Sequence, residues 1–142
     1  MRLQSAIFTP EDALAGREGA EKVLTILKME GVWMYAVTAL ARAEAEALLR
    51  EAGLFDFFRG VLTTAETGRA LTDAALYEKA MRRLQSLPRD TVVFTGRLDV
   101  LRGAKAAGLR VVAVKGAADA DEWAALCERA DEAVERYDEF LA

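Results

Sequence analysis

The chain has 142 residues, enough for one domain with a buried core, and we expect a single domain over residues 1–142. With 53% hydrophobic and 30% charged residues, it has the composition of a soluble globular protein, and no apolar run approaches the ~18 residues of a membrane span. The net charge of −4 and the lack of any cluster of Lys and Arg argue against a nucleic-acid-binding surface.

Two residue counts exclude further classes of chemistry. The chain has no histidine, which rules out His-based acid–base catalysis and His-ligated zinc. The single cysteine, Cys127, cannot form an internal disulfide. Together with an N-terminus that lacks the basic-then-apolar layout of a signal peptide, this favours a cytoplasmic location.

Short apolar segments alternate with amphipathic segments along the chain. Strands are predicted over residues 5–8, 33–37, 61–62, 92–94 and 110–114. Helices are predicted over residues 18–29, 41–52, 72–86, 98–107, 121–129 and 135–141, the third with Thr72 as its N-cap. Trp33 opens an apolar strand, and we expect it in the core. The alternation predicts an α/β fold: a Rossmann-like, three-layer α/β/α sandwich with a central parallel sheet.

The segment from Val92 to Val114 is the most informative part of the chain. Its strand, turn, helix and strand are typical of a βαβ unit, in which the loop after the first strand lies at the functional end of the sheet. That loop carries Thr95, Gly96 and Arg97. It therefore offers hydroxyl, amide and guanidinium groups and no carboxylate.

Five short motifs follow one another at or near the ends of the predicted elements. They are Phe8-Thr9-Pro10-Glu11-Asp12-Ala13-Leu14, Val37-Thr38, Gly53-Leu54-Phe55-Asp56-Phe57-Phe58, Leu71-Thr72-Asp73-Ala74 ahead of Tyr77, and Val92-Val93-Phe94-Thr95-Gly96-Arg97. In this order they resemble the haloacid dehalogenase (HAD) superfamily, in particular its phosphatase and β-phosphoglucomutase-like branch. The matching family motifs are F-D-x-D-G-[TV]-L, a Ser or Thr after the second strand, G-L-x-x-[YF]-F, K-P-D-P and V-V-F-[EG]-D-S.

The resemblance implies a phosphatase mechanism whose residues are largely replaced in this chain. In the family, the first Asp forms an aspartyl-phosphate, a second carboxylate handles the proton, a lysine neutralises the phosphate and acidic residues hold Mg²⁺. The corresponding positions hold Thr9, Glu11, Leu71, and Thr95 with Gly96, and only the phosphate-contacting Thr38 matches. We therefore expect no phosphatase activity by the family mechanism and no cofactor.

The resemblance also predicts that the domain has no cap. The segment between Glu11 and Thr38 contains one loop and one helix, and the segment from Thr38 to Leu71 is filled by core elements. In the family, a capless core leaves the strand ends open, which implies macromolecular partners or help from a neighbouring subunit. A homodimer through these open ends is one form this could take.

One hypothesis is that the altered site binds a phosphate-containing small molecule or another anion without turnover. The proposed ligand-binding residues are Thr9, Thr38, Arg69, Thr95 and Arg97, because hydroxyls, arginines and free backbone N–H groups suit an anion. The alternative for the two arginines is that they are solvated loop residues.

Two other hypotheses remain open from the sequence. A protein-interaction role could use Trp33, Trp123, Tyr137 and Phe140 as anchors. A core position is favoured for each, because Trp33 opens a central strand and the others lie on amphipathic helices that must bury one face. A rearranged metal-dependent phosphatase could instead use Glu11 or Asp12 with Asp99 to bind Mg²⁺. Asp99 also lies where a helix N-terminus favours an acidic residue.

Overall fold

A computed structural model describes residues 3–14, 18–115, 119–137 and 139. Its strands are β1 (Ser5–Phe8), β2 (Trp33–Thr38), β3 (Phe58–Thr63), β4 (Thr91–Thr95), β5 (Arg110–Val114) and β6 (Glu132–Val134). Its α-helices are α1 (Ala20–Met29), α2 (Arg42–Glu51), α3 (Thr64–Thr67), α4 (Ala74–Leu84), α5 (Leu98–Ala106) and α6 (Ala120–Arg129). A π-helical turn η1 (Pro10–Leu14) and two 3-10 turns, η2 (Phe55–Phe57) and η3 (Pro88–Asp90), complete the described elements. Within these ranges, no helix has the length and apolarity needed to cross a bilayer.

The six strands form one parallel sheet in the order β3-β2-β1-β4-β5-β6. The chain starts in the middle with β1, builds outward through β2 and β3, and then returns to the other side of β1 with β4. Strand order therefore reverses between β1 and β4. In open α/β sheets, ligands bind outside the carboxyl ends of the strands at such a point. This topology confirms the predicted Rossmann-like parallel sheet.

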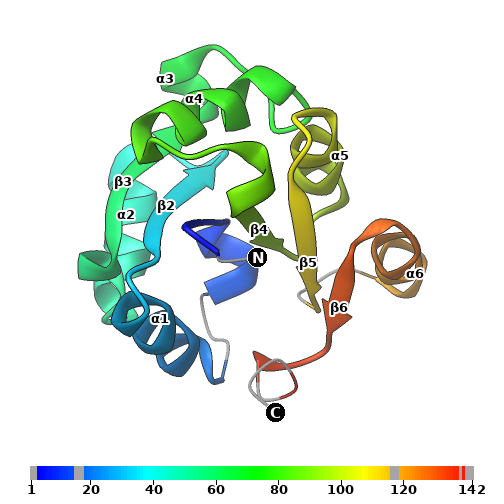
Figure 1. Ribbon diagram of the computed structural model, residues 1–142, viewed down its shortest axis with the longest axis horizontal. Coiled ribbons are helices and arrows are strands. Elements are labelled where there is room, and N and C mark those ends of the chain that lie inside the picture. Colours follow the sequence, from blue (N-terminus) through cyan, green and yellow to red (C-terminus); the bar gives the residue numbers. More distant parts are fainter. Residues whose placement is uncertain (1–2, 15–17, 116–118, 138, 140–142) are drawn as a thin grey trace.

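Helices cover both faces of the sheet, so the core has two layers (Figure 1). Alternate residues of each strand point to opposite faces because the side-chain period of a strand is two. Phe8 and Phe94 pack in the cluster that contains the apolar face of α1, whereas Ile7 and Val93 pack in the cluster that contains α4 and α5. Burial on both faces explains why the central strands are apolar throughout.

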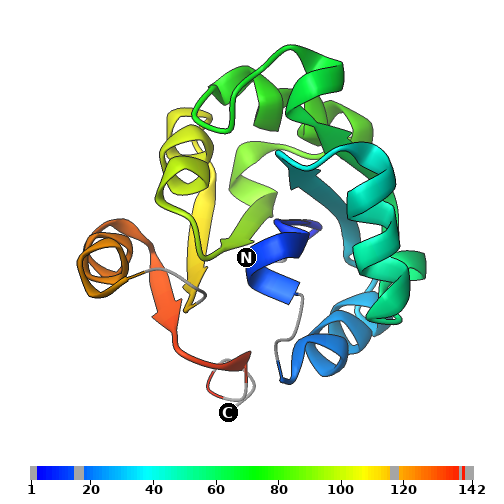
Figure 2. The same cartoon turned by 180° about the vertical axis from the view of Figure 1, so that it is seen from behind.

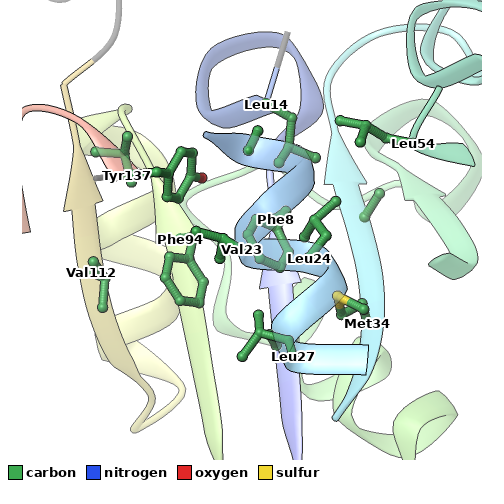
Figure 3. Packing of buried hydrophobic residues seen from close by; sticks show 14 of the residues in the cluster. Phe8, Leu14, Val23, Leu24, Leu27, Met34, Leu54, Phe94, Val112 and Tyr137 are labelled. Carbon is green, nitrogen blue, oxygen red and sulfur yellow. The ribbon is translucent and has the colours of Figure 1, made fainter. Parts of the chain in front are cut away.

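The layer under α1 is held together by aromatic contacts (Figure 3). The ring of Phe8 stacks on that of Phe94, with centroids 4.7 Å apart, and Leu24 of α1 belongs to the same buried cluster. Tyr137 packs against Phe94, and its hydroxyl donates to the carbonyl oxygen of Ala13 at 2.8 Å. A residue near the C-terminus thus fixes the turn that follows β1.

The structure confirms most predicted elements and corrects two details. The helix predicted from residue 72 begins at Ala74, because the side chain of Asp73 accepts from the backbone N–H of Ala75 at 2.9 Å. Asp73 is therefore its N-cap, not Thr72. Trp33, predicted to be a core residue, is 40% exposed. It is the first residue of β2, where the strand emerges from the layers that bury its later residues.

The sequence prediction was incomplete at the C-terminal end. Residues 132–134 form β6, which pairs with β5 and was not predicted. The segment has one buried apolar residue, Val134, too few for an alternating pattern to be recognised. The helix predicted over residues 135–141 includes residues 138, 140 and 141, which lie outside the described residues. Tyr137, within it, is buried.

The predicted absence of a cap is confirmed by the connections between strands. In the described residues, η1 and α1 lie between β1 and β2, and α2 and η2 lie between β2 and β3. The connection from β3 to β4 consists of α3, α4 and η3 with their loops. The resemblance predicts possible cap positions between Glu11 and Thr38 and between Thr38 and Leu71. In the described residues, neither segment contains an inserted domain.

Gly103 offers a test of the packing between α5 and the segment before α4. A Cβ at this position would lie 2.3 Å from the carbonyl oxygen of Leu71 and 2.4 Å from Cε2 of Tyr77. On an open helix face, Ala in place of Gly adds roughly 0.5–1 kcal/mol of stability. Here we expect Gly103→Ala to lower the free energy of unfolding by about 1–3 kcal/mol through overpacking, as measured by urea denaturation. Arg102→Ala, at the adjacent exposed position, is the control, and a Gly103→Ala protein at least as stable as the parent would contradict this packing.

Candidate functional site

Three threonines meet at the carboxyl ends of the central strands. Thr9 follows β1 directly, Thr38 ends β2 and Thr95 ends β4. Because β2, β1 and β4 are adjacent and parallel, their carboxyl ends lie at the same edge of the sheet. All three side chains are fully buried there. The turn η1, blue at the centre of Figure 2, follows Thr9 directly.

The turn η1 brings Asp12 back onto the strand ends. The backbone N–H of Ala13 donates to the carbonyl of Thr9 at 2.9 Å, which closes the turn. Asp12 Oδ1 then accepts from Thr9 Oγ1 at 2.5 Å, from the backbone N–H of Gly96 at 3.0 Å and from Thr95 Oγ1 at 3.4 Å. Thr9 Oγ1 and Thr95 Oγ1 are 2.9 Å apart. One carboxylate oxygen therefore joins the end of β1 to the end of β4.

Glu11 makes the corresponding contact with β2. Its Oε2 accepts from Thr38 Oγ1 at 2.8 Å, and Thr38 Oγ1 in turn accepts from the backbone N–H of Leu40 at 3.0 Å. Glu11 Oε1 is buried and accepts no hydrogen bond from any described residue. Two neighbouring carboxylates of the chain thus occupy the hydroxyl donors of the site.

The pKa of Asp12 lies above that of an ordinary aspartate. Burial raises its pKa from 3.8 to about 6, and the negative charge of Glu11 adds to the rise. The hydrogen bonds from Thr9 and from the amide of Gly96, together with the positive charge of Arg97, act in the opposite direction without cancelling it. Asp12 is therefore mostly ionised at pH 7 and mostly protonated at pH 5.

Arg97 and Asp99 form a two-point ion pair beside these carboxylates. Arg97 Nε lies 3.0 Å from Asp99 Oδ1, and Nη2 lies 2.9 Å from Oδ2. The guanidinium lowers the pKa of Asp99, and the carboxylate raises that of Arg97. Asp99 also accepts from the backbone N–H of Val100 at the start of α5, the helix-terminal role allowed by the sequence. Arg97 is therefore held in place by a partner.

Other predicted site residues lie in different surroundings. Arg69 is exposed and pairs with Asp73, with Nη1 3.6 Å from Oδ2. Leu71 is buried, and its carbonyl accepts from the hydroxyl of Tyr77 at 2.5 Å. Gly96 contributes its backbone amide to Asp12. The structure thus brings the three threonines, Gly96 and Arg97 to the strand ends, whereas Arg69 has a carboxylate partner of its own.

A hollow of about 540 Å³ opens beside the strand ends. Its charged lining residues are Glu11, Asp12, Arg97, Asp99, Arg102 and Glu122. Arg102 and Glu122 were not predicted as site residues from the sequence. Glu122 comes from α6, and its carboxylate accepts from the backbone N–H of Leu98 at 3.3 Å. Only the three-dimensional packing of α6 on α5 shows that it belongs to the hollow.

The residues present do not fit a magnesium ion of the kind the family resemblance implies. Mg²⁺ binds oxygen ligands in octahedral geometry. No group of three or more acidic, His or Cys side chains suited to a metal is found in the described ranges. Asp12 Oδ1 already accepts three hydrogen bonds, and Asp99, the third carboxylate of the rearranged-site hypothesis, is paired with Arg97. The neighbouring guanidinium adds positive charge.

The candidate interaction anchors differ in exposure. Tyr137 is a core residue, and Trp123 is partly buried against the layer of α4 and α5. Trp33 differs from these two residues because its side chain is substantially exposed. Phe140 lies outside the described residues.

The pKa of Asp12 predicts how stability depends on pH. Because the folded protein holds this proton more tightly than the unfolded chain does, the free energy of unfolding should fall as pH rises from about 4 to about 6. Asp12→Asn removes the buried charge, and we expect it to flatten this part of the profile and to add about 1–3 kcal/mol at pH 7. Urea denaturation over pH 4–8 measures both, with the exposed Asp56→Asn as control. A loss of stability at pH 7 in Asp12→Asn would contradict a destabilising buried charge.

Comparison with known proteins places this geometry in a family. A family model described as haloacid dehalogenase-like hydrolase matches residues 4–135. Curated protein sequences give no significant match. Among solved structures, CbbY from Rhodobacter sphaeroides in complex with phosphate is 24% identical with a TM-score of 0.76 and covers 87% of this chain and 55% of its own. A protein from Thermotoga maritima described as a β-phosphoglucomutase is 23% identical with a TM-score of 0.76, covering 88% of this chain and 57% of its own.

A third structure matches over a similar length. The core domain of a protein described as a phosphoglycolate phosphatase from Streptococcus pneumoniae TIGR4 is 18% identical with a TM-score of 0.68 and covers 80% of both chains. By contrast, this chain spans little more than half of CbbY. At these identities the structures show a shared fold, and the family match spans nearly the whole sequence. The chain belongs to the haloacid dehalogenase-like hydrolase family.

Proposed function

We propose that this HAD-like domain binds a phosphate-containing ligand or another small dianion at the carboxyl ends of β1, β2 and β4, without hydrolysing it by the family mechanism. One observation carries the proposal: the donors at this edge already bind anionic oxygens. Thr9, Thr95 and the Gly96 amide surround Asp12 Oδ1, and Thr38 donates to Glu11 Oε2. A donor set that binds two carboxylates is chemically suited to a phosphate or sulfate.

The residue at the nucleophile position is unsuited to turnover. Thr9 is a neutral hydroxyl, its side chain has no exposed surface, and its proton is donated to Asp12. A substrate phosphorus would have to reach an oxygen that is buried and hydrogen-bonded to Asp12. The position expected to supply a positive charge holds Leu71, which is apolar and buried.

Ligand binding at this edge requires the two carboxylates to move or to lose their charge. Protonation of Asp12, with its pKa of about 6, removes one negative charge near neutral pH. The half-exposed Arg97 would then face the incoming anion beside the Gly96 amide. The phosphate bound by CbbY, which has the same fold, is consistent with this proposal.

Sulfate is the sharpest probe, because it remains a dianion throughout the accessible pH range. Any change of its affinity with pH therefore comes from the protein. We expect sulfate to bind up to about a hundredfold more tightly at pH 5 than at pH 8, because the protonated fraction of Asp12 falls from roughly 0.9 to roughly 0.01 over this range. Calorimetric or NMR titration measures this difference. Asp12→Asn should bind at pH 8 as tightly as the parent does at pH 5 and should lose the pH dependence.

The control for this titration is Arg89→Gln, an exposed residue of η3 at the other end of β4. It should leave sulfate binding unchanged, whereas Arg97→Gln should weaken it. Absence of saturable binding at both pH values in the parent and in Asp12→Asn would sink the proposal. Equal affinity at pH 5 and pH 8 would show that Asp12 does not compete with the anion.

The alternative function is a rearranged metal-dependent phosphatase, favoured by the position of Glu11 and Asp12 at the strand ends and by the unpartnered Glu11 Oε1. A magnesium-dependent assay on an aryl phosphate at high protein concentration distinguishes the two. We expect no turnover above a protein-free blank. Magnesium-dependent turnover that disappears in Glu11→Gln would overturn the proposal in favour of this alternative.

A further inference from the structure

The amino-terminal end of the sheet carries a second hollow, of about 490 Å³. It lies where β2 and β3 begin, beside the end of α1 and the turn η2, and the residues that matter are Lys28, Trp33, Asp56, Phe57 and Arg59. Trp33 is the first and Thr38 the last residue of β2. Five residue steps of about 3.3 Å separate them by roughly 17 Å. This hollow is therefore distinct from the candidate site described above.

Two cations in this hollow are positioned by aromatic rings. The guanidinium carbon of Arg59 lies 3.7 Å from the ring centroid of Trp33, and Lys28 Nζ lies 5.6 Å from that of Phe57. Each geometry is that of a cation–π contact. Neither cation forms an ion pair with a carboxylate among the described residues. Asp56 is the one acidic residue of the lining, so the hollow has a net positive charge.

The arrangement is suited to a particular kind of ligand. A guanidinium that lies over an indole keeps its N–H groups in its own plane, so they remain free to form a fork with a phosphate or carboxylate. Trp33 is 40% exposed, and it also lines a neighbouring hollow of about 310 Å³. Part of the indole is therefore accessible for stacking with a planar ring. A volume near 490 Å³ lies within the usual range for small-molecule sites.

We propose that the hollow around Trp33 and Arg59 is a second ligand site, for a small molecule in which a planar aromatic ring carries a phosphate or carboxylate group. The anionic group binds Arg59 and Lys28, and the ring stacks on Trp33. The site does not depend on the function proposed for the strand ends, because it uses other residues at the opposite end of the sheet.

Trp33 itself provides the signal for the test. In a Trp123→Phe background, Trp33 is the one remaining tryptophan, so the fluorescence reports on the surroundings of Trp33. The probe is adenosine 5′-monophosphate, which does not absorb at the wavelengths that excite tryptophan selectively. We expect saturable quenching with a Kd of about 0.1–1 mM. Adenosine, which lacks the phosphate, and ribose 5-phosphate, which lacks the ring, should each bind at least about tenfold more weakly.

Variants of the hollow separate this site from the strand ends. Arg59→Gln should weaken binding of the probe about tenfold, and Arg59→Lys less, since it keeps the charge and loses the fork. Glu11→Gln should leave binding unchanged, and so should Arg129→Gln, an exposed control at the end of α6. Circular dichroism checks that each variant is folded. No saturable quenching up to about 10 mM, binding that is insensitive to Arg59→Gln, or equal binding of ribose 5-phosphate would overturn the proposal.

Discussion

The site depends on one carboxylate oxygen, Oδ1 of Asp12. It accepts hydrogen bonds from Thr9 after β1, from Thr95 at the end of β4 and from the amide of Gly96. These groups meet because the parallel sheet reverses its order between β1 and β4. Asp12 is thus an internal anion at the position where α/β folds usually bind an external one. The cost of burying its charge raises its pKa to about 6 and makes the site sensitive to pH.

The remainder of the fold holds this carboxylate in place. The π-helical turn η1 returns the chain toward the strand ends, and Tyr137 fixes that turn by donating to Ala13 from the far end of the sequence. Beneath the turn, Phe8 stacks on Phe94 in the layer covered by α1 (Figure 3). Glu11 adds a second internal carboxylate on Thr38. Packing, strand order and hydrogen bonding therefore all place two carboxylates of the chain itself on the hydrogen-bond donors at the strand ends.

The sequence predicted the parallel sheet, because central strands buried on both faces are apolar throughout and alternate with amphipathic helices. It also placed Thr9, Thr38 and Thr95 at one edge, since parallel strands end together. It could not predict that Asp12 would accept from Thr9 and Gly96, because that contact depends on the conformation of η1. The contribution of Glu122 depends on helix packing, and the pairing of β6 depends on the free edge of β5. Neither leaves a local pattern in the sequence.

The central claim is that the Asp12 carboxylate and an external anion compete for the same donors. The most direct measurement is a carbon-13 NMR titration of the Asp12 carboxyl group, with and without saturating sulfate. We expect a pKa near 6 without sulfate and a higher value in its presence, because a bound dianion favours the protonated acid. A pKa close to the ordinary 3.8, or one that sulfate leaves unchanged, would contradict it.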